Sequence, residues 1–140
     1  MQAQSRQAYD IVKKVCAIYP EIIAAYLFGS QATRQAGSES DYDIALLLKT
    51  GSESEFDYLD FKLALEKALN RDVDLVILNN AGAPIKHQVR RDGKVIFDRD
   101  PKKRMEWEIL SRKMYQDFLH LHSIYMQGMK KALRSSSHGR

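Results

Sequence analysis

The 140-residue chain has 44% hydrophobic and 29% charged residues, a composition typical of a globular protein with one hydrophobic core. Seven glycines and three prolines are too few for a low-complexity chain. No apolar run approaches the roughly 20 residues that span a bilayer, and the first residues lack the apolar stretch of a secretory signal. The lone cysteine, Cys16, excludes an internal disulfide. We therefore expect a single soluble, cytoplasmic domain with no membrane association.

The positive charge is concentrated in the C-terminal part of the chain. The net charge is +4, yet residues 101–140 alone carry nine basic and three acidic side chains. Such a segment could bind nucleic acid or an acidic protein surface, or be the solvated side of a helix. No nucleic-acid-reading motif accompanies it. The sequence therefore favours a solvated face or a protein partner, and direct nucleic-acid binding is not expected.

The first half of the chain alternates helical and strand-like segments. Apolar residues at steps of three and four predict a helix over 5–19, which Pro20 ends. The segments that follow are a strand over 24–28, a turn of helix and a loop over 31–40, a strand over 42–48, a polar loop over 49–54, a helix over 55–69 and a strand over 73–78. The helix over 55–69 is expected to place Phe56, Leu59 and Leu63 on one apolar stripe.

The second half is dominated by one long helix. A short helix over 84–91 and a strand over 95–97 precede it, and Asp100–Pro101 forms a helix-start signal. The apolar stripe of this segment consists of Trp107, Leu110, Met114, Phe118, Leu121, Tyr125 and Met129. It indicates one continuous amphipathic helix that covers the sheet or partly faces a partner. We expect residues 1–133 to form the domain and residues 134–140 a flexible polar tail.

Two short motifs carry residues suited to phosphate chemistry. Gly29–Ser30 ends a predicted strand, where a glycine lets the backbone approach a ligand and a serine adds a hydroxyl donor. Asp41 and Asp43 lie two apart at the start of the next strand and therefore point to one face. Two carboxylates beside an apolar strand repel each other, and a magnesium ion would remove that cost. Two solvated aspartates at a strand start are the alternative.

A third carboxylate is expected from the strand over 73–78. Asp74 lies inside its apolar run, whereas Asp72 follows Asn70–Arg71 and can still belong to the turn. A carboxylate within a strand is unfavourable without a partner. We therefore take Asp74 as the third acid and Asp72 as the alternative.

Together these residues resemble a known family. Gly29–Ser30, ten residues and then Asp41-x-Asp43 are similar to the signature of the minimal nucleotidyltransferases of the DNA polymerase beta superfamily, and Asp74 matches their third acid. The resemblance covers essentially the whole chain. It implies an α/β (α+β) nucleotidyltransferase fold, with a small mixed sheet of about four strands flanked by helices and a long C-terminal helix.

The resemblance also implies roles for individual residues. Asp41, Asp43 and Asp74 would be the catalytic acids and the ligands of two Mg²⁺ ions, with ATP as substrate. Gly29 and Ser30 would bind the terminal phosphates. The family often has an arginine three residues after the serine, where this chain has Thr33. The neighbouring Arg34 is therefore the candidate nucleotide ligand. Lys86, Arg90 and Arg91 could also reach the triphosphate, although solvation at the surface is expected for two of the three.

Small members of this family resemble the antitoxin half of a two-component module, whose partner is a HEPN-domain ribonuclease toxin. The implied activity is transfer of AMP from ATP to a tyrosine hydroxyl of that toxin. Two alternatives remain open: a non-catalytic antitoxin that neutralises the toxin by contact, and transfer to a small molecule. The absence of a second, substrate-binding domain disfavours the small molecule, and the three acids favour catalysis over contact alone.

Overall fold

The computed structural model describes residues 2–29 and 42–138 and is built around a four-stranded mixed sheet. The strands are β1 (Ile22–Phe28), β2 (Tyr42–Leu48), β3 (Val73–Ile77) and β4 (Lys94–Asp98), arranged in the order β3-β2-β1-β4. β1 is antiparallel to both β2 and β4, and β2 is parallel to β3. This confirms the expected small mixed sheet, with β1 beginning two residues before its predicted start.

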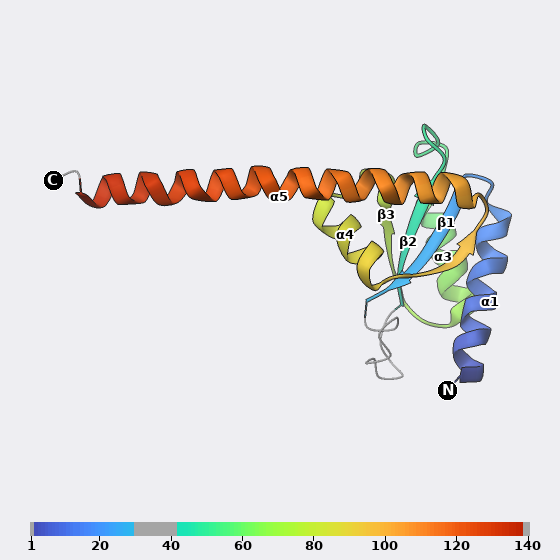
Figure 1. Ribbon diagram of the computed structural model, residues 1–140. Coiled ribbons are helices and arrows are strands. Elements are labelled where there is room, and N and C mark those ends of the chain that lie inside the picture. The colour runs from blue at the N-terminus through green and yellow to red at the C-terminus, as the bar shows by residue number, and fades with distance from the viewer. Residues whose placement is uncertain (1, 30–41, 139–140) are drawn as a thin grey trace.

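Helices cover both faces of the sheet (Figure 1). They are α1 (Gln2–Ile18), α3 (Tyr58–Leu69), α4 (Ala83–Asp92) and α5 (Pro101–His138), with a 3₁₀ turn over Leu78–Asn80 after β3. α1 and α3 pack on one face, where Val12, Phe61 and Leu65 join the core. α4 and α5 lie on the other, where Val89 and Trp107 pack. No described helix is both long and apolar enough to cross a membrane.

The alternation of side chains along the strands builds these two cores. Ala25 and Leu27 of β1 face the α1/α3 side, and Tyr26 and Phe28 face the α4/α5 side. All seven residues of β1 are buried because the strand is central and covered on both faces. The apolar runs seen in the sequence are therefore explained by two-sided burial.

The predicted apolar stripe of α3 is wrong. Leu59 and Leu63 are 62% and 55% exposed, whereas Phe61 and Leu65 are fully buried. The face of the helix that packs on the core is the one that carries Phe61 and Leu65. The Asp57 side chain accepts a hydrogen bond from the Asp60 amide, so the helix starts at Tyr58 and does not include Phe56. Phe56 is buried in the preceding loop and does not define a helical face.

Cys16 lies in the core between α1 and the sheet, and burial raises the pKa of its thiol to about 12. The folded chain thus holds this proton more tightly than the unfolded chain, whose thiol has a pKa near 9.0. Its contribution to stability is present below about pH 9 and is lost as pH rises toward 12. We expect denaturant titrations to give a lower free energy of unfolding at about pH 10 than at about pH 8. A Cys16→Ser chain with the same pH dependence would contradict this attribution.

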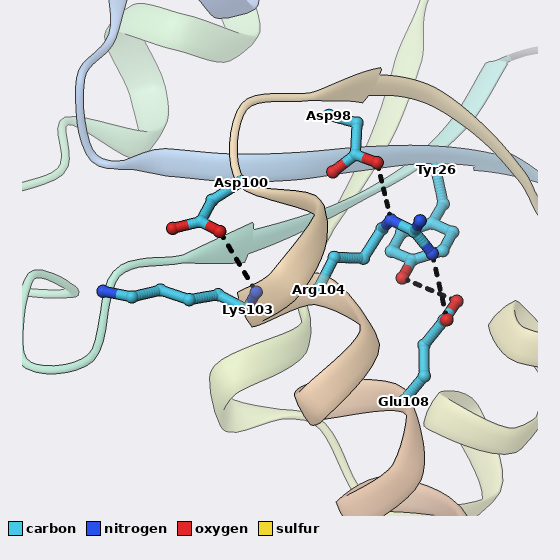
Figure 2. A network of polar contacts seen from close by, with 6 residues as sticks. All are labelled: Tyr26, Asp98, Asp100, Lys103, Arg104 and Glu108. Atoms are coloured by element: carbon cyan, nitrogen blue, oxygen red, sulfur yellow. Dashed lines mark hydrogen bonds and ion pairs between the residues drawn. The ribbon is translucent and has the colours of Figure 1, made fainter.

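The start of α5 is fixed to the sheet by a polar network (Figure 2). Arg104 pairs with Asp98 of β4 at 2.8 Å and with Glu108 at 3.0 Å, and the Tyr26 hydroxyl donates to Glu108 at 3.1 Å. Asp100 caps the helix by accepting from the Lys103 amide at 3.2 Å, which confirms the predicted start at Asp100–Pro101. The network joins β1, β4 and the first two turns of α5, so the direction of the helix is set by the sheet.

The C-terminal half of α5 extends beyond the body of the protein (Figure 1). The helix is longer than predicted, because residues 134–138, expected to belong to a polar tail, continue it to His138. Among the members of the predicted stripe, Trp107 is partly buried against the sheet. The stripe members from Leu110 to Met129 are all exposed. Only the beginning of the stripe therefore covers the sheet.

Candidate active site

Two of the predicted acids lie side by side at one end of the sheet. In the parallel pairing of β2 and β3, Asp43 is directly opposite Asp74, and in the antiparallel pairing of β1 and β2, Phe28 is opposite Asp43. Neighbouring strands are about 4.8 Å apart, so residues 31 positions apart in the chain are brought together. Gly29 follows Phe28 directly and lies at the same end.

The same register separates Asp74 from Asp72. Asp74 is the second residue of β3 and exposed, between the buried Val73 and Leu75. Asp72 precedes the strand, and its carbonyl oxygen accepts a hydrogen bond from the Tyr42 amide at 3.1 Å. Asp72 is thus one step outside the row that joins Asp43 to Asp74. The geometry supports Asp74 as the partner of Asp43.

The carboxylate pair faces the side of the sheet that carries α4 and α5. Side chains in one row share a face, and Phe28, in the row of Asp43, belongs to the core beneath α4 and α5. Asp43 is half-buried, so its charge is only partly solvated. A ligand at this pair would therefore approach from the α4/α5 side and the adjacent end of the sheet.

Gly29 is required here for a reason that the sequence does not reveal. Its φ is +75°, a conformation that L side chains rarely adopt. A Cβ at this position would lie 2.2 Å from Oδ2 of Asp43 and 2.9 Å from its Cγ. The missing side chain thus leaves the space that the Asp43 carboxylate occupies. The glycine therefore positions an acid, in addition to the phosphate contact expected of its amide.

Three predicted site residues lie outside the described part of the chain. These are Ser30, Arg34 and Asp41. Their expected roles as phosphate ligand, nucleotide ligand and metal ligand remain predictions. In the sequence they fall between Gly29 and Tyr42. Gly29 and Tyr42 themselves lie at the end of the sheet that carries Asp43.

The basic residues of α4 differ in their surroundings. Arg90 is half-buried, and burial together with the charge of Arg112 on α5 lowers the pKa of its guanidinium. Its Nε and Nη2 are buried without a hydrogen-bond partner among the described residues. Arg91 is exposed and pairs with Asp92 at 3.0 Å. Arg91 is thus a solvated surface cation held by a salt bridge. A triphosphate contact by the half-buried Lys86 or by Arg90 stays a prediction.

The donor set fits magnesium. Asp43 and Asp74 supply hard carboxylate oxygens on adjacent strands, and Mg²⁺ prefers one or two carboxylates completed by substrate phosphates and water. No cluster of three potential ligands occurs within residues 2–29 and 42–138, and the third expected ligand, Asp41, is outside these ranges. The described pair could therefore form the protein part of a site that a nucleotide completes.

A comparison with family profiles identifies the fold. The profile described as "Polymerase beta, Nucleotidyltransferase" matches residues 11–102, which include Gly29, Asp43 and Asp74. The chain belongs to this nucleotidyltransferase family. A search of curated protein sequences gives no match.

Several solved structures that are similar to this chain are of toxin–antitoxin complexes. A chain of a toxin–antitoxin structure with AMP-PNP is 25% identical, with a TM-score of 0.73 over 87% of this chain and 98% of that one. A structure of a tri-AMPylated Shewanella oneidensis HEPN toxin in complex with its MNT antitoxin matches at 24% identity and a TM-score of 0.68, over 91% and 98% of the two chains. An MntA–HepT toxin–antitoxin structure matches at 23% and 0.69, over 89% and 98%. The last two, at lower identity, show the fold alone.

Sequence reasoning missed the polar network that anchors α5 in this nucleotidyltransferase. Arg104 and Glu108 have the i, i+4 spacing of a helical ion pair, which was a usable signal. Their links to Asp98 and Tyr26 depend on tertiary structure and have no local signal. The stacking of His87 on Tyr115, with centroids 3.9 Å apart, was also not foreseen.

Proposed function

We propose that the chain is a magnesium-dependent adenylyltransferase that moves AMP from ATP to a tyrosine hydroxyl of a HEPN-domain ribonuclease and thereby acts as its antitoxin. The observation that carries the proposal is the paired Asp43 and Asp74, held in register across β2 and β3 with Gly29 beside Asp43. The AMP-PNP and the tri-AMPylated HEPN toxin named for two similar structures support the nucleotide and the acceptor.

The proposed reaction is an in-line displacement. The tyrosine oxygen forms a bond to the α-phosphorus of ATP, the bond from that phosphorus to the bridging oxygen breaks, and pyrophosphate leaves. Asp43 and Asp74, with Asp41, would hold Mg²⁺, which when bound supplies charge neutralisation of the triphosphate. Asp74 is the more exposed of the pair and is the group that would orient the tyrosine hydroxyl and help remove its proton.

A non-catalytic antitoxin is the second candidate, and the exposed part of α5 favours it. A helix with many exposed apolar side chains could neutralise a toxin by contact alone. The two candidates differ in what they require of the acids. Contact needs α5 but not the carboxylates, whereas transfer needs both Asp43 and Asp74.

Labelled ATP separates the candidates. The purified chain is incubated with Mg²⁺, ATP labelled at the α-phosphate, and the purified HEPN-domain protein of the same organism. We expect label on the HEPN-domain protein, lost when its tyrosines are replaced by phenylalanine, and a parallel loss of its ribonuclease activity. If the ribonuclease activity is lost but no label is transferred from any of the four nucleoside triphosphates, neutralisation by contact is supported instead.

A further inference from the structure

The half of α5 that leaves the body carries a continuous apolar face. Its large apolar side chains are between 37% and 65% exposed, far more than the apolar side chains of a helix packed in a domain. These side chains are Phe118, Leu119, Leu121, Ile124, Tyr125, Met126, Met129 and Leu133. Leu121, Tyr125 and Met129 are four residues apart and thus lie along one side of the helix. Scattered exposed apolar residues are ordinary, but a row of this length indicates an interaction surface.

This face continues the one that packs on the body. Trp107 packs against the core beneath α4 and α5, Ser111 is 2% exposed, and Tyr115 stacks on His87 of α4. The aromatic contacts then continue along α5 from Tyr115 to Phe118 and from Phe118 to His122. Figure 1 shows that α5 continues beyond α4. An occupant of the projecting face would thus lie next to α4, on the side of the sheet that Asp43 and Asp74 face.

Charge determines which occupant fits. Beyond Glu108, the described part of α5 has one acid, Asp117, and five basic residues, which are Arg112, Lys113, Lys130, Lys131 and Arg134. At 100° per residue, Lys130 and Lys131 fall on opposite borders of the apolar face, and so do Arg112 and Lys113. Basic residues therefore flank the apolar face on both sides at its two ends, at Arg112 and Lys113 and at Lys130 and Lys131, and none lies between these pairs.

A second copy of this chain is a poor occupant. Two such helices packed through their apolar faces, parallel or antiparallel, would bring the basic borders of one copy against those of the other, where like charges are unfavourable. A partner helix with acidic residues bordering an apolar stripe has the opposite pattern. Nucleic acid would satisfy the charge but would leave the apolar face between the two basic borders uncovered.

We propose that the projecting part of α5, residues 115–134, is the docking helix for the acceptor protein, which covers it with an apolar helical surface bordered by acidic side chains. The proposal rests on the proposed function only in taking the occupant to be the HEPN-domain protein that receives AMP. Docking itself needs none of the carboxylates. The polar network at Arg104 holds the docking helix in a fixed direction relative to the sheet, so binding there would present the partner to the same side as the acids.

The test compares two pairs of substitutions that add the same charge. Leu121→Glu/Tyr125→Glu changes the apolar face, and Ser123→Glu/Gln127→Glu changes the opposite, polar side of the same turns. Calorimetry of each full-length chain with the purified HEPN-domain protein measures the dissociation constant, and circular dichroism checks that α5 stays helical. We expect the apolar pair to weaken binding by about a hundredfold or more, and the control pair by less than about fivefold. A third variant, Lys130→Glu/Lys131→Glu, should slow association by about tenfold at low salt.

The possible outcomes are distinguishable. The proposal is overturned if the Leu121→Glu/Tyr125→Glu variant binds the HEPN-domain protein as tightly as the native chain does. It is also overturned if the native chain does not bind the HEPN-domain protein. A dimer of the native chain in sedimentation that the apolar pair alone dissociates likewise overturns it, because the occupant is then a second copy. Preferential binding of duplex RNA through Lys130 and Lys131 overturns it as well. If the native chain binds the HEPN-domain protein through α5 but transfers no AMP, the proposed activity fails and the docking surface stands.

Discussion

Replacement of Asp43 by asparagine is expected to lower the rate of AMP transfer by about a thousandfold or more. Asp43 is half-buried, opposite Asp74 in the β2–β3 register and beside the backbone of Gly29. Asparagine keeps the shape of the side chain but removes the charge that would bind Mg²⁺. Transfer of label from α-labelled ATP to the HEPN-domain protein measures the effect, and calorimetry with the same protein is expected to show unchanged docking.

Asp72→Asn is the matched control. Asp72 is two residues from Asp74 but precedes β3, outside the row that joins the acids. We expect this variant to retain transfer within about threefold of the native rate, since its carboxylate is not paired with Asp43. If Asp72→Asn were as damaging as Asp43→Asn while Asp74→Asn were mild, the assignment of the third acid would have to move to Asp72.

The sheet was predictable because burial on both faces leaves a strong local signal. The runs at 24–28, 42–48 and 73–78 are apolar almost without interruption, and each coincides with a strand to within two residues. The start of α5 was predictable for a similar reason, since Asp100 and Pro101 act within one helical turn. These features depend on neighbours in the chain, which a sequence displays directly.

The features that were not predictable depend on contacts between distant segments. The sequence favours Asp74 over Asp72 through its place in the apolar run, but that Asp74 lies directly opposite Asp43 follows only from the β2–β3 register. The apolar stripe of α3 was misjudged because Phe56 packs from a loop before the helix begins. How far α5 leaves the body also depends on the size of the sheet that it crosses. A periodic stripe looks the same whether it covers a core or awaits a partner.

A second large effect is expected for Gly29→Ala. The new methyl group would meet Oδ2 of Asp43 at 2.2 Å, and the backbone φ of +75° would add strain of about 1–2 kcal/mol for an L residue. The carboxylate and the backbone cannot both keep their positions, so the acid would be displaced from its place opposite Asp74. We expect the rate of AMP transfer to fall by about a hundredfold, together with a lower midpoint in thermal unfolding.

Gly51→Ala separates strain from displacement. Gly51 has a φ of +83°, close to that of Gly29, but within the described residues no atom beyond its own chain neighbours lies within 4 Å of a Cβ built there. Its substitution should cost a similar amount of stability through the backbone and leave transfer unchanged. A Gly29→Ala chain that lost stability like Gly51→Ala but kept full activity would show that the glycine serves only the turn. Loss of activity at Gly29 alone would show that the absence of a side chain there holds the Asp43 carboxylate in its working position.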